Sequence, residues 1–145
     1  MGNLISLLDF AHQKGIEIEW FPMQAAESLS LPLPDGSYGV AIDPDKIQSE
    51  VDEYCKIAHE VGHCATGAFY NRYSTFDIRE KQEHRADRWA VQRTISCEEL
   101  DQAVAEGYTE LWMLADYFGV TEDFMKKAVC FYTHGNLAVD QYMNF

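Results

Sequence analysis

The sequence predicts an α+β fold, in which a short β-rich segment is followed by a helical remainder. Three observations support this class: helical spacing of apolar residues near the N-terminus, two strand-like runs in the first third of the chain, and helical periodicity from Ser49 onward. With 145 residues, of which 47% are hydrophobic, the chain can build a core. We expect one domain over residues 1–145, with a core over about 1–95 and helices over about 96–145 packed on it.

The first elements are separated by turn signals. Residues 3–14 carry apolar side chains at helical spacing and are followed by Gly15, which predicts a helix that ends there. Residues 16–21 alternate apolar and acidic side chains, as a half-exposed strand does, and residues 38–42 form a second strand. Prolines and a glycine between the two strands predict a turn. Because short loops cannot make the crossover that parallel strands require, we expect a small antiparallel sheet.

Five helices are predicted after this sheet. Ser49 is suited to cap the first of them, which carries an apolar stripe from Val51 to Ala68. Ser96 and Glu99 form a capping box that begins the third helix. The remaining helices are expected at about residues 78–95, 109–118 and 121–133, and the third ends near residue 107.

Charge and cysteine usage exclude several classes of protein. The chain has 24 acidic and 11 basic residues, a net charge of −13, which repels nucleic acids and anionic membranes and attracts a basic partner. Its four cysteines contain no CxxC pair, which is typical of reduced thiols in the cytosol. No run approaches the roughly 20 apolar residues of a membrane span. We therefore expect a cytoplasmic protein that binds neither nucleic acid nor membranes directly.

Residues 59–63, HEVGH, match the metal-binding pattern HExxH inside a predicted helix. His59 and His63 lie one turn apart on the same helix face, so both imidazoles can reach one ion. Glu60 lies about 100° around the helix, where it can act as a general base without being a ligand. Accidental occurrence of this pattern is about 1–2%. Gly62 costs the helix about 1 kcal/mol relative to alanine, which indicates close approach of backbone or substrate.

A catalytic zinc site needs a third protein ligand and one open position. On the next predicted helix, Glu83 shares a narrow face with Ala86 and Ala90, two small residues that allow close packing against the HExxH helix. Glu83 is therefore the preferred third ligand, and His84, about 100° away, is the weaker alternative. Asp87, one turn after Glu83, is placed to accept the second ring N–H of a histidine ligand.

Other roles stay open at this point. The strand at residues 38–42 is either a site where an extended substrate adds to the sheet or an ordinary edge strand. Tyr70, Tyr73 and His134 are available to stabilise an oxyanion, and the sequence does not favour one of them. Cys64 lies off the ligand face and is expected to be a small core residue. The aromatic segment at 108–132 is expected to pack as a helical hairpin, with substrate docking as the alternative.

The motif at residues 59–63, together with EHRADRWA at residues 83–90, resembles the ImmA/IrrE family of small bacterial and phage metallopeptidases. Members of that family carry HExxH on one helix and E-x-x-A-(N/D)-x-(F/W)-A on the next. The resemblance implies a minimal zincin-like core: an N-terminal helix, a small sheet, the HExxH helix and a glutamate-bearing helix, followed by C-terminal helices. It also implies gluzincin-type ligation of one Zn²⁺ per chain by His59, His63 and Glu83, with Glu60 as the general base.

The resemblance implies a biological role as well. Family members encoded beside the repressors of phages and mobile elements cleave those helix-turn-helix repressors, and other members regulate stress responses. The expected function is therefore that of a zinc endopeptidase that cleaves a specific protein, namely a basic DNA-binding repressor.

Two other classes of function fit part of the pattern. One is a catalytically silent regulator with a zincin fold, which binds a repressor or another partner without cleaving it. The other is a protein with a purely structural zinc. An intact Glu60 favours the peptidase over the silent regulator, because binding alone does not need this residue. Three ligands and an open position favour it over a structural site, because structural zinc sites are closed and usually rich in cysteine.

Overall fold

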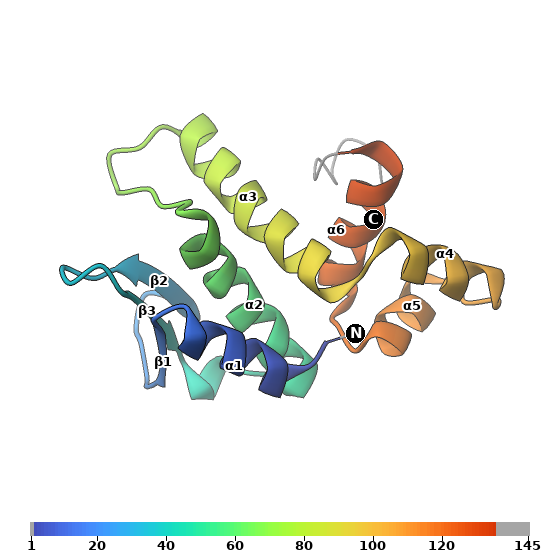
Figure 1. The fold of residues 1–145 in the computed structure, drawn as a ribbon, viewed down its shortest axis with the longest axis horizontal. Coiled ribbons are helices and arrows are strands. Elements are labelled where there is room, and N and C mark those ends of the chain that lie inside the picture. Colours follow the sequence, from blue (N-terminus) through green and yellow to red (C-terminus); the bar gives the residue numbers. More distant parts are fainter. Residues whose placement is uncertain (1, 136–145) are drawn as a thin grey trace.

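The structure is a computed structural model that describes residues 2–135, and within them it contains six α-helices and one small sheet (Figure 1). The predicted α+β class is confirmed. The elements are α1 (Leu4–Gln13), β1 (Ile16–Trp20), β2 (Ser28–Pro32), β3 (Tyr38–Ile42), a 3-10 turn (Pro44–Lys46), α2 (Glu50–Thr66), α3 (Phe76–Thr94), α4 (Cys97–Ala105), α5 (Leu111–Phe118) and α6 (Glu122–His134). None of the helices described is both long and apolar enough to cross a membrane.

The three strands form a mixed sheet in the order β1-β3-β2. β2 and β3 are antiparallel, but β1 and β3 are parallel, with Ile16 opposite Tyr38. The expected antiparallel pairing is therefore wrong for β1 and β3. The prediction did not include the strand β2, which pairs with the side of β3 opposite to β1. The connection over residues 21–37 contains this strand and is long enough for β3 to run parallel to β1.

The sheet topology also corrects both alternatives expected for residues 38–42, a substrate-binding strand or an ordinary edge strand. β3 pairs with a strand on each side, so its backbone groups are already bonded within the sheet. A peptide cannot add to residues 38–42 for this reason. The edge strand beside α2 is β2, and among the described residues no strand pairs with its outer side.

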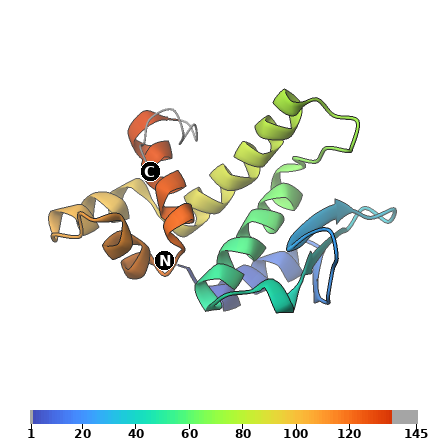
Figure 2. The same cartoon turned by 180° about the vertical axis from the view of Figure 1, so that it is seen from behind.

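Helix α2 is the central element of the fold. In Figures 1 and 2 it lies between the sheet and α6, and it packs against β2, β3 and α3. Ile57, Ala58 and Val61 on this helix are fully buried and form part of the core. Glu60 and His63 are buried as well, which is rare for such side chains unless they have polar partners.

The helix starts follow the predicted caps. The Ser49 side chain accepts the N–H of Asp52 at the start of α2, and Ser96 with Glu99 forms the expected capping box at α4. α3 begins at Phe76, two residues before the expected start, because the Thr75 side chain caps it.

Gly62 sets the distance between α2 and α3. A Cβ atom at this position would lie 2.5 Å from the backbone carbonyl oxygen of Ala86. Ala86 and Ala90 are both buried, so the small-residue face of α3 packs on α2 as predicted. Of the two reasons expected for a glycine in mid-helix, the structure therefore shows close approach of another backbone. The same approach places the side chains of α3 against those of α2.

We expect Gly62→Ala to lower the free energy of unfolding by about 1–3 kcal/mol, although alanine is the better helix former, because the added methyl group forces the α3 backbone away. Urea or thermal unfolding measures this. Ala65→Gly, at an exposed position of the same helix, is the control, and its cost is at most about 1 kcal/mol. A Gly62→Ala protein as stable as the native one would contradict this account of the helix contact.

Candidate metal centre

Two histidines of α2 and one glutamate of α3 direct their polar atoms at a common point. The Nε2 atoms of His59 and His63 are 3.2 Å apart. One oxygen of Glu83 lies 2.7 Å from Nε2 of His59, and its other oxygen lies 3.2 Å from Nε2 of His63. The three side chains predicted as metal ligands are thus brought together by the contact between α2 and α3.

The outer nitrogen of each histidine ring has a partner that fixes the tautomer. Nδ1 of His63 contacts the backbone carbonyl oxygen of Ala68, which can only accept a hydrogen bond. Nδ1 of His59 lies 2.7 Å from Oδ1 of Asp87, so the residue predicted to support a histidine ligand contacts one of the two candidate histidines. Because each Nδ1 donates its proton to this partner, the Nε2 atom of each ring, once it carries no proton, directs its lone pair at the shared point.

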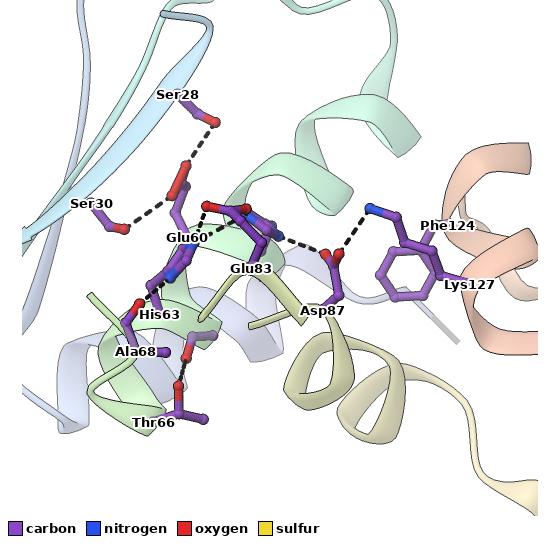
Figure 3. A network of polar contacts seen from close by, with 12 residues as sticks. Ser28, Ser30, Glu60, His63, Thr66, Ala68, Glu83, Asp87, Phe124 and Lys127 are labelled. Atoms are coloured by element: carbon purple, nitrogen blue, oxygen red, sulfur yellow. Dashed lines mark hydrogen bonds and ion pairs between the residues drawn. The ribbon is translucent and has the colours of Figure 1, made fainter. Parts of the chain in front are cut away.

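The end of α2 supplies the partner of His63. Gly67 terminates the helix in the left-handed conformation, with φ of 66°, which favours glycine. Its N–H and that of Ala68 both donate to the His63 carbonyl oxygen. The chain turns back there, and the Ala68 carbonyl meets the His63 ring (Figure 3). One glycine thus ends the helix and helps to orient a histidine.

A cation from the C-terminal helices balances the charge of Asp87. Nζ of Lys127 on α6 lies 3.0 Å from Oδ2 of this carboxylate (Figure 3). His59 contacts the other oxygen of the carboxylate. Burial raises the pKa of Asp87, but the hydrogen bond to His59 and the charge of Lys127 outweigh it, and the net result is a lowered pKa. Asp87 is therefore ionised, and its carboxylate lies between the Lys127 ammonium group and the His59 ring.

The donor set fits a tetrahedral zinc ion. For Zn–N distances of about 2.0–2.1 Å, neighbouring ligand atoms of a tetrahedral site lie about 3.3–3.4 Å apart. The 3.2 Å between the two Nε2 atoms and the 3.2 Å from Glu83 to His63 are close to this spacing, whereas the 2.7 Å from Glu83 to His59 is a hydrogen-bond distance that a bound ion would lengthen. Burial lowers the pKa of His59, but hydrogen bonds to Asp87 and Glu83 raise it to about 10. Burial raises the pKa of Glu83, but hydrogen bonds from His59 and His63 lower it overall. In the metal-free protein a proton on His59 thus satisfies the anions that a metal cation would otherwise satisfy.

Glu60 is close to this point but faces a different direction. Together with the two histidines it forms a group whose ligand atoms lie within 4.8 Å of one another. Its two carboxylate oxygens, however, accept hydrogen bonds from Ser28 and Ser30 of β2. Glu83 contacts both Nε2 atoms directly, so on distance Glu83 is the better third ligand, and Glu60 is left beside the site.

A cavity of about 370 Å³ opens over these side chains, and it is lined by both histidines, both glutamates, residues 28–30 of β2 and residues 68–70. Tyr70 is therefore at the site, and its hydroxyl donates to Glu83 at 2.8 Å. Tyr73 is 79% exposed and points away, with its hydroxyl bonded to Arg72. Of the candidate oxyanion donors, Tyr70 alone lines the cavity; His134 lies at the end of α6.

The weaker ligand candidates lie elsewhere. His84 is not among the residues that line the cavity, and its Nε2 atom lies 3.9 Å from Oε1 of Glu80. Cys64 is buried in the core, and burial raises the pKa of its thiol to about 12, so it is no thiolate ligand. Both placements agree with the helical positions expected from the sequence.

Three polar partners at the site were not anticipated. Ser28 and Ser30 contact Glu60, and Lys127 contacts Asp87. The alternation of serine and leucine in SLSLP at residues 28–32 is a strand signal that could have located the serines, but the nearby prolines led us to expect a turn. No comparable signal marks Lys127, because its position depends on how α6 packs on α3.

An HExxH helix packed on a glutamate-bearing helix, beside a small sheet with an open edge, defines a protein of the metallopeptidase type. The family model of the IrrE N-terminal-like domain, a peptidase family, matches residues 11–129 of the chain. The chain belongs to this family, which confirms the resemblance seen in its motifs. The comparison with curated proteins gives no match.

We expect Asp87→Asn to weaken zinc binding about 10–100-fold, because the amide is a poorer acceptor for the His59 ring. Competition with a chromophoric chelator measures the affinity. Glu80→Gln is the matched control, since this exposed carboxylate of α3 lies near His84 rather than the two histidines. An Asp87→Asn protein that binds zinc as tightly as the control would show that Asp87 does not support the site.

Zinc binding near pH 7 should release about one proton per ion, because the raised pKa keeps His59 protonated in the metal-free protein and zinc needs its lone pair. Affinity should therefore rise about tenfold per pH unit between pH 6 and 8. Calorimetric titration in two buffers of different ionisation enthalpy counts the proton. Binding heats that are independent of the buffer would contradict a protonated His59.

Proposed function

We propose that this protein is a cytoplasmic zinc-dependent endopeptidase that cleaves a specific basic protein, namely a helix-turn-helix repressor of a phage or mobile element. The observation that carries the proposal is the division of roles between two glutamates. Glu83 contacts both histidines, whereas Glu60 stands beside them in the same cavity without occupying the position of a ligand.

The residues of the site suit peptide hydrolysis. A zinc ion bound by His59, His63 and Glu83 would polarise the scissile carbonyl group and acidify the attacking water. Glu60 takes a proton from this water as its oxygen bonds to the carbonyl carbon. Glu60 then delivers the proton to the amide nitrogen as the C–N bond breaks, which leaves a carboxylic acid and an amine. Tyr70, whose hydroxyl is directed into the cavity, is the nearest candidate donor to the oxyanion.

The edge of β2 is suited to align the substrate. Residues 28–30 line the cavity, and β2 is an edge strand that an extended peptide can join through main-chain hydrogen bonds. Leu31 of the same strand is 42% exposed and can contact an apolar side chain of the peptide. The proposal thus gives β2 the substrate-binding role that was one of the two alternatives for residues 38–42.

The charge of the chain supports a basic partner. The net charge of −13 attracts a positively charged protein and repels DNA, so a DNA-binding protein is the expected substrate rather than DNA itself. The family resemblance is what favours a repressor among basic proteins.

Glu60→Gln should keep one zinc per chain and lower the rate of cleavage by at least about 10²–10⁴-fold, because the amide cannot accept the proton from water. The zinc-loaded protein would be incubated with purified helix-turn-helix repressors from phages and mobile elements of the same genome, and fragments would be identified by mass spectrometry. His59→Ala should lose both zinc and cleavage. Glu80→Gln, far from the base, should cleave normally.

The same comparison separates the enzyme from a silent regulator. A repressor that binds the native protein and the Glu60→Gln variant equally, and that neither protein cuts, would reject the peptidase. Cleavage that survives a chelating agent would reject the role of the metal.

A further inference from the structure

Two serines of one strand hold the proposed catalytic base. Oγ of Ser28 donates to Oε2 of Glu60 at 2.9 Å, and Oγ of Ser30 donates to Oε1 at 3.0 Å (Figure 3). The serines are two residues apart in β2, so both side chains lie on the same face of the sheet. Each carboxylate oxygen keeps a lone pair for the proton of a water molecule. The two bonds therefore fix the carboxylate without blocking it.

The backbone of the same two serines faces the open edge of the sheet. At one end of the β2–β3 ladder Asp43 N–H donates to the Glu27 carbonyl, and at the other Leu33 N–H donates to the Ser37 carbonyl. Residue pairs that share backbone hydrogen bonds alternate with pairs that do not along an antiparallel ladder. Since residues 27 and 33 are hydrogen-bonded to β3, the odd-numbered residues of β2 are the ones whose backbone groups bond to β3. The N–H and C=O groups of Ser28 and Ser30 consequently point away from β3.

Pro32 agrees with this assignment. Like the two serines, Pro32 is an even-numbered residue of β2, so its backbone nitrogen faces the open edge. Because proline has no N–H, its place at this position costs no hydrogen bond to β3. Residues 28 and 30 are the positions of β2 that keep an N–H available to an incoming peptide.

We propose that Ser28 and Ser30 are positioning residues that connect substrate docking to the alignment of Glu60. The inference rests on the proposed peptidase function. An extended peptide that pairs with β2 bonds to the backbone of these two residues, while their hydroxyls hold both oxygens of the base. Docking thus immobilises the residues that orient Glu60, and the base is aligned while the substrate is bound.

The first test uses the metal-free protein and needs no substrate. Ser28→Thr/Ser30→Thr and Ser28→Val/Ser30→Val are matched double variants, because threonine and valine have the same shape and differ in the hydroxyl. With Glu60 present, we expect the threonine variant to melt about 3 °C or more above the valine variant. In the Glu60→Ala background the difference should vanish. An equal difference in both backgrounds would mean that the hydroxyls do not act on Glu60, and would overturn the proposal.

The second test measures catalysis with the repressor as substrate. The valine variant should cleave about tenfold or more slowly than the threonine variant at saturating substrate, with zinc content and KM unchanged, because a displaced base lowers kcat. Equal kcat values for the two variants would overturn the positioning role.

A third comparison isolates the backbone contact. Ser30→Ala and Ser30→Pro both remove the hydroxyl, but only proline removes the N–H that faces the open edge. We expect equal kcat values and a KM about tenfold higher for the proline variant, the value of one lost hydrogen bond. Equal KM values for the two variants would show that the substrate does not bind the backbone N–H of Ser30, and would overturn the proposed connection between docking and the alignment of Glu60. A native protein that leaves the repressor intact would reject the proposed function, whereas the melting comparison would still test the contact with Glu60.

Discussion

The contact between α2 and α3 at Gly62 and Ala86 is the constraint on which the site depends. The ligand candidates come from both helices, and the spacings of 2.7 and 3.2 Å between Glu83 and the histidines require the two backbones to be in contact. A Cβ atom at position 62 would lie 2.5 Å from the Ala86 carbonyl oxygen, so a side chain there would push the two helices apart and move Glu83 away from the histidines. The glycine costs helix propensity, and what it gains is a rigid alignment of three donors that belong to different segments of the chain.

The negative charges around the candidate metal centre have positively charged or donating side chains as partners even without a metal ion. Glu83 and Asp87 are both partly or largely buried anions, and His59 lies between them while Lys127 contacts Asp87 from the other side. This arrangement keeps the carboxylates ionised in the metal-free protein, because each has a donor or cation as a partner. It also makes α6 part of the site, although it carries none of the candidate ligands: the C-terminal helices contribute the cation nearest to the residue that supports His59.

Local periodicity is what made much of the site predictable. His59, Glu60 and His63 lie within one helix, where spacing alone fixes which side chains share a face, and the small residues around Glu83 indicated which face of α3 would approach them. The direction of β1 relative to β3, the serines of β2 and the contact of Lys127 could not be predicted in this way. Each depends on which side of a neighbouring element a segment occupies, and that choice is made by packing over the whole domain rather than by the residues of the segment.

The open edge of β2 has a consequence for how the protein behaves at high concentration. A strand edge that accepts one peptide also accepts the same strand of another copy, which is the usual route to β-sheet aggregation. Here the edge is only five residues long, it ends in a proline, and each copy carries a net charge of −13. Like charges oppose the approach of two copies, so the net charge protects the exposed strand from self-association. The same charge would attract the basic partner that we propose.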